Sequence, residues 1–105
     1  MREEASAVAY TFFMDLTGLP NAEMIETGLS NLRSDLESIE SLLVMIGAPR
    51  LRRIGFDVPP ATVDHPEHRL FELLAESGAD SAHSRYNALI RALTSFERAA
   101  ECAIH

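Results

Sequence analysis

Apolar residues recur at alternating steps of three and four between residues 22 and 46, and this heptad pattern is the feature that most constrains the fold. The seam consists of Ala22, Ile25, Leu29, Leu32, Leu36, Ile39, Leu43 and Ile46. Such a repeat places one continuous apolar stripe along an α-helix. Gly28 falls inside it and indicates a bend or a close crossing. The pattern predicts one long helix that ends at Gly47. Glycine readily adopts the left-handed backbone conformation found at helix C-termini, and Pro49 just beyond it cannot continue the helix.

Three further segments have a helical period. The first covers residues 3–16 and ends before Gly18. The next begins at Pro66, where Asp64 and Glu67 have the spacing of a capping box, and it closes at Ser77-Gly78. The last follows a cap at Asp80 or Ser81 and runs toward the C-terminal residues.

Residues 48–63 lack a clear period. The pair Pro59-Pro60 favours an extended connection, and we expect Phe56 and Val58 to fold back onto the helices. Four helices without a convincing strand predict an all-α fold, a small four-helix antiparallel bundle with a proline-containing crossover loop between the second and third helices. The 105 residues suit a single domain, residues 1–105.

The charge composition limits the partners. Nine arginines oppose sixteen acidic residues and lysine is absent, so the formal net charge is −7 at pH 7. Nucleic-acid binding is not expected, because neutralising phosphates requires basic surface. No apolar run reaches the roughly 20 residues of a membrane span. Cys102 is the one cysteine, which excludes an internal disulfide, and acidic residues near the N-terminus oppose a secretory signal, so we expect a cytoplasmic protein.

The histidines form one group of candidate ligands. A metal or small-ligand site is predicted from residues near the junction of the last two helices, namely His65, His68, Glu72 and His83. His68 and Glu72 are four residues apart and share one helix face. Imidazole and carboxylate groups suit zinc, iron or manganese. The alternative is structural, because helix capping alone explains His65 and Glu67.

The arginines form a second candidate group. Arg50, Arg52 and Arg53 occupy four consecutive positions with Leu51 and could hold an anion or an acidic partner. Their alternative role is to stabilise the carbonyl end of the preceding helix.

The heptad seam also carries a prediction about assembly. We expect a self-association seam formed by Leu29, Leu32, Leu36, Ile39, Leu43 and Ile46. Leu42, Val44 and Met45 lie off this seam, so the end of the helix is apolar nearly all round, and large uncovered apolar patches mark interfaces. The alternative is that the seam forms the core of a single bundle.

The chain lacks a phosphate-binding glycine loop, a nucleophile elbow and a zinc-protease motif. We therefore expect a non-enzymatic interaction module without a cofactor, which forms a homodimer and presents an acidic face to a protein partner. The alternative is a metal- or small-ligand-binding bundle that uses the histidine group.

Overall fold

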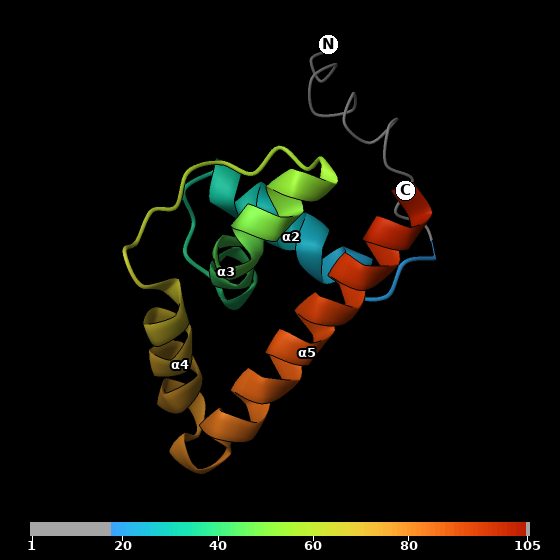
Figure 1. Ribbon diagram of the computed structural model, residues 1–105. Coiled ribbons are helices and arrows are strands. Elements are labelled where there is room, and N and C mark those ends of the chain that lie inside the picture. Colours follow the sequence, from blue (N-terminus) through green and yellow to red (C-terminus); the bar gives the residue numbers. More distant parts are fainter. Residues whose placement is uncertain (1–17, 105) are drawn as a thin grey trace.

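The structure is a computed structural model that describes residues 18–104. Those residues contain four helices and no strand, which confirms the all-α prediction. The helices are α2 (Ala22–Arg33), α3 (Ile39–Ile54), α4 (Pro66–Ser77) and α5 (Ala79–Ile104), and Figure 1 shows their arrangement. The helix predicted at residues 3–16 lies outside the described residues.

Helix α3 is the centre of the fold. It contacts α2, α4 and α5, while α4 and α5 diverge like the arms of a V from the turn at Gly78 (Figure 1). Consecutive residues of α3 are buried around its whole circumference, including Leu42, Leu43 and Val44, none of which has exposed surface. The sequence is apolar nearly all round here because three helices cover this one.

The long helix predicted across the heptad seam is wrong, because the chain turns between α2 and α3. Asp35 adopts a left-handed conformation with φ 59°, and the amide of Leu36 donates to the carbonyl of Asn31 at 2.8 Å. This is a Schellman-type helix end. Ser38 then caps α3: its Oγ accepts from the amide of Ser41 at 3.0 Å, and Ser41 Oγ accepts in return from the amide of Ser38 at 2.8 Å.

The turn divides the predicted self-association seam. Leu29, Leu32 and Leu43 are buried inside the single chain, and Ile39 and Ile46 are half-buried against the same core. Leu36 lies in the turn and exposes 57% of its surface. Most of the seam therefore packs within one chain, and Leu36, near its middle, is the seam residue left exposed for an outside contact.

Helix α3 continues beyond its predicted end. It passes through Gly47 and Pro49 and stops at Gly55, which has φ 126°. Gly47 serves close packing instead of capping: a β-carbon there would lie 3.0 Å from Leu93 Cδ1 on α5. Burial of Leu51 in the final turns compensates for the hydrogen bond that the proline cannot donate.

The connection from α3 to α4 carries the expected prolines and apolar anchors. Phe56 and Val58 are buried, and the Phe56 ring lies 5.6 Å from that of Phe96 on α5. The capping box predicted from Asp64 is wrong. His65 occupies the N-cap position of α4, and its side chain accepts no hydrogen bond from the first turn of the helix. Pro66 does begin the helix.

The turn between α4 and α5 is shorter than predicted. Ser77 ends α4 and Gly78 links it directly to Ala79, so α5 begins before the predicted caps at Asp80 and Ser81. The amide of Gly78 donates to the carbonyl of Ala75 at 3.2 Å. This tight connection fixes the vertex of the α4–α5 hairpin.

Candidate binding groove between the last two helices

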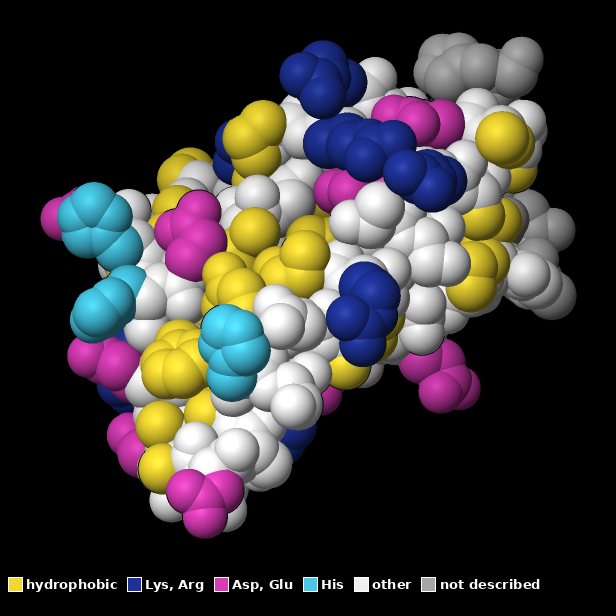
Figure 2. Space-filling view, turned by 60° about the horizontal axis from the view of Figure 1, so that its bottom comes forward, with side chains coloured by type: hydrophobic (Ala, Val, Ile, Leu, Met, Phe, Trp, Pro, Cys, Tyr) yellow, Lys and Arg dark blue, Asp and Glu magenta, His cyan; other side chains and the backbone are white. Residues whose placement is uncertain are grey.

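The divergence of α4 and α5 leaves a hollow between them, which we call the α4–α5 groove. Its volume is about 630 Å³, and it is lined by His65, Glu67, His68, Phe71, His83, Tyr86 and Asn87. The space-filling view shows the histidines around hydrophobic side chains on this face (Figure 2). The groove thus combines an apolar floor with a polar rim, as binding sites commonly do.

Phe71 is the central aromatic residue of the groove. Its ring lies 6.1 Å from that of Tyr86 and 6.4 Å from that of His83, in edge-on arrangements that aromatic pairs prefer. Partial burial raises the pKa of the Tyr86 hydroxyl, and the carboxylate of Glu67 raises it further. Despite these neighbours, Phe71 remains 38% exposed.

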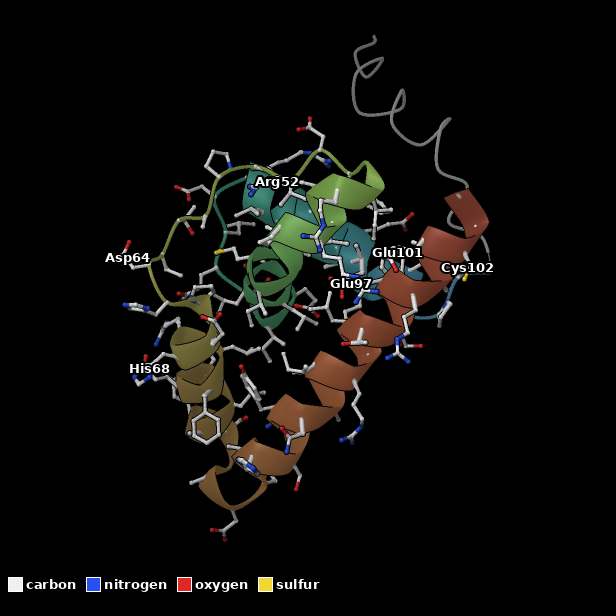
Figure 3. All side chains as sticks on the ribbon, viewed as in Figure 1. Arg52, Asp64, His68, Glu97, Glu101 and Cys102 are labelled. Carbon is white, nitrogen blue, oxygen red and sulfur yellow. The ribbon has the colours of Figure 1, made fainter. Side chains whose placement is uncertain are left out.

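Three of the four predicted ligands line the same groove. His65, His68 and His83 all line it, whereas Glu72 does not. The carboxylate of Glu72 lies 3.4 Å from His68 Nε2 and accepts a hydrogen bond of 3.1 Å from Arg69. Figure 3 shows His68 on α4. Within residues 18–104, no three acidic, histidine or cysteine side chains are grouped closely enough to hold a metal ion.

Two of the three clustered arginines are engaged within the chain. Arg50 makes a bidentate pair with Glu101, at 2.8 and 2.7 Å, and a longer contact of 3.4 Å with Glu97. Figure 3 shows both carboxylates on α5, facing the region of α3. Arg52 donates to the carbonyls of Val58 and Pro59, each at 3.0 Å through Nη2, and so secures the connecting loop. Arg53 is exposed at the end of α3.

Glu97 is a buried acid that was not among the residues predicted from the sequence. It is 4% exposed and packs against the small surface of Gly47, where a β-carbon would lie 2.9 Å from its Oε2. Burial raises the pKa of Glu97, and the nearby Arg50 opposes that shift. The spacing of Glu97 and Glu101, four residues apart opposite an arginine cluster, is the signal that could have predicted this pairing.

The aromatic part of the groove was also missed. Phe71 has the period of the α4 core residues Leu70 and Leu74, which are fully buried, but it lies at the edge of that stripe. Tyr86, on α5, is half-buried at the rim of the core. The sequence does not fix the angle between two helices, which decides whether such an edge residue is covered.

Comparison of the chain with protein-family models gives no match, and comparisons with curated proteins and with solved structures give none either. Of the helices in the described part of the chain, none has both the length and the apolar character needed to cross a bilayer.

Proposed function

We propose that this chain is a helical protein-interaction module of the cytoplasm, that it self-associates through the α4–α5 groove, and that its acidic surface is offered to a protein partner. The observation that carries the proposal is the exposure of Phe71 beside a hollow lined by Tyr86 and His83. An aromatic side chain that exposes more than a third of its surface gains from being covered.

A second copy of the chain suits this groove because the partly exposed ring of Phe71 and the hollow lie side by side on one surface. In a two-fold dimer the same surface faces itself, so each copy must supply both parts of the contact. Phe71 of one copy can then lie against the hollow of the other. The polar rim of His65 and Glu67 surrounds this contact, as is usual at interfaces.

The acidic surface lies on the exposed side of α4. Glu67, Glu72 and Glu76 are exposed along this helix. Arg69 pairs with Glu72 at 3.1 Å and lies 4.0 Å from Glu76, so part of the charge is neutralised and Glu67 is left at the rim of the groove. A basic segment of a partner would complement this surface.

Light scattering coupled to size-exclusion chromatography tests the self-association. We expect the wild-type chain to be a dimer at tens of micromolar and Phe71→Ser to be a folded monomer with an unchanged helical circular-dichroism spectrum. Leu36→Ser is the matched control, because Leu36 is exposed outside the groove. A monomeric wild-type chain would refute self-association, and a monomer caused by Leu36→Ser alone would move the interface to the α2–α3 turn.

A second candidate function rests on the same groove. His65, His68 and His83 all line it and are exposed, so the alternative occupant is a small ligand with hydrogen-bond acceptors, or a divalent metal that draws histidines together which are not grouped closely enough to hold it as they stand. Isothermal titration of zinc into untagged protein distinguishes the two. Metal binding that is lost in His68→Ala but retained in Phe71→Ser would favour the ligand site over the protein interface.

A further inference from the structure

The outer surface of α5 carries a second hollow, which we call the α5 strip. It has a volume of about 430 Å³ and is lined by Ile90, Arg91, Thr94, Ser95 and Arg98. These residues follow one side of the helix for two turns. The strip begins one turn after Asn87, which lines the α4–α5 groove, and no lining residue is shared between the two hollows.

The α5 strip is basic although the protein as a whole carries a net charge of −7. Between residues 81 and 100 the sole acid is Glu97, and its side chain is buried toward α3 and Arg50. The exposed charges along that stretch are therefore those of arginines. A local reversal of the overall charge indicates a surface that meets an acidic group.

Arg91 and Arg98 also differ from the arginines that hold the fold together. Arg50 and Arg85 each donate to a side chain on another helix, and Arg69 donates to Glu37 in the turn between α2 and α3. Within the described residues, Arg91 and Arg98 make no hydrogen bond or ion pair, and both are exposed. Their guanidinium groups keep all their donors available for a carboxylate.

The spacing of Arg91 and Arg98 along α5 matches the spacing of two side chains on a partner helix. Seven residues separate Arg91 from Arg98, which corresponds to about 10.5 Å along a helix. A helix laid along α5 reproduces this distance when it carries two carboxylates seven residues apart. Half-buried Ile90 and the short hydroxyl side chains of Thr94 and Ser95 leave room for an apolar residue between the two charged contacts.

We propose that the α5 strip binds an acidic amphipathic helix of a partner protein, with carboxylates on Arg91 and Arg98 and an apolar residue over Ile90. A nucleic acid is the less suitable occupant, since the rest of this acidic chain repels a polyanion at long range. The proposal is independent of self-association through the α4–α5 groove, because it uses different residues.

Fluorescence anisotropy with a labelled synthetic peptide tests the proposal. The probe is an alanine-based helix of 21 residues with leucines on one side and glutamates seven residues apart beside them. Two control peptides have the glutamates replaced by glutamine or by arginine. We expect the acidic helix to bind, its affinity to fall as sodium chloride is raised, and the glutamine helix to bind about fivefold more weakly.

Variants of the chain locate the contact. Arg91→Gln combined with Arg98→Gln should weaken binding of the acidic helix about fivefold. The matched control, Arg33→Gln combined with Arg85→Gln, removes the same charge outside the strip and should leave the affinity unchanged. Phe71→Ser should also leave it unchanged, even where it abolishes self-association.

Each contrary result overturns the proposal. These results are the absence of binding by the acidic helix, equal losses in the two double variants, loss of binding in Phe71→Ser, and tighter binding of a DNA duplex than of the peptide. The last two would place the helix in the α4–α5 groove or identify the strip as a nucleic-acid surface.

Discussion

Gly28 of α2 lies so close to Val44 of α3 that a β-carbon on the glycine would be 2.5 Å from the valine Cγ2. The same β-carbon would also clash with the backbone carbonyl of Glu40. The backbone cannot move aside as the end of a flexible side chain could. This close crossing holds α2 against the central helix, and it explains why a glycine occupies the interior of α2.

Replacing Gly28 by alanine should therefore destabilise the protein, although alanine favours helices more than glycine does. We expect a loss of about 1–3 kcal/mol, because overpacking outweighs the gain in propensity of about 1 kcal/mol. Urea denaturation measures the change. The control is Thr27→Ala at the exposed neighbouring position, which should be neutral or slightly stabilising. An increase in stability of Gly28→Ala would show that α2 does not pack on α3 in this way.

Two leucines of the heptad seam, one buried and one exposed, should respond differently to truncation. Leu43 is fully buried, so Leu43→Ala should cost about 2–5 kcal/mol through lost burial and the cavity left behind. Leu36 is 57% exposed, so Leu36→Ala should change stability by less than about 1 kcal/mol. Thermal unfolding of both variants at low protein concentration makes the comparison. Equal losses would support a continuous helix through residues 33–39.

These two positions also show how far the sequence predicts the fold. The heptad period marked Leu29, Leu32 and Leu43 as the buried side of a helix, and they are buried within the single chain, which was the alternative to a seam between two copies. It could not show that the chain reverses at Asp35, because an apolar pattern continues in phase across a short turn. The turn is marked in the sequence only by polar residues, among them Asn31 and Ser38. In the structure the side-chain amide of Asn31 donates to Ser38 Oγ at 2.9 Å across this turn.

The α4–α5 groove was predictable only in part, because the sequence shows which residues are close along the chain but not the angle between two helices. Residues near the α4–α5 junction are brought together by a short turn, so the grouping of His65, His68 and His83 followed from sequence distance. The exposure of Phe71 depends on how far α4 and α5 diverge. That angle is set by α3 packing between them, which is a contact between residues distant in sequence.

A surface ion pair between α4 and the α2–α3 turn should make stability depend on pH. Arg69 donates two hydrogen bonds of 2.9 Å to Glu37, and these bonds lower the pKa of the Glu37 carboxyl from its usual 4.5. Because the folded-state pKa is lowered, the contribution is complete above pH 4.5 and is lost as the pH falls through the lowered value.

The variant Glu37→Gln should consequently be less stable than the wild type at pH 7 and equal to it at pH 2. The difference should be small, since both side chains are more than a third exposed. Melting temperatures followed by circular dichroism at the two pH values measure it. A difference that persists unchanged at pH 2 would mean that the glutamine alters packing and not the ion pair.

The buried acid on α5 should have the opposite pH dependence. Burial raises the pKa of Glu97 above its usual 4.5, and Arg50, whose Nη1 lies 3.4 Å away, offsets only part of this shift. The folded state therefore holds the Glu97 proton more tightly than the unfolded state does. Ionisation of Glu97 costs stability, and this cost develops as the pH rises from the unfolded value through the raised folded one.

Glu97→Gln should thus be more stable than the wild type at pH 7, with the advantage shrinking as the pH is lowered to 4, because glutamine keeps the shape of the side chain without its charge. Glu101→Gln is the matched control: it removes the bidentate bonds to Arg50 at 2.8 and 2.7 Å, so it should lower stability at pH 7. Urea denaturation at both pH values measures the four differences. Lower stability of Glu97→Gln at pH 7 would mean that the attraction of Arg50 exceeds the cost of burying the charge.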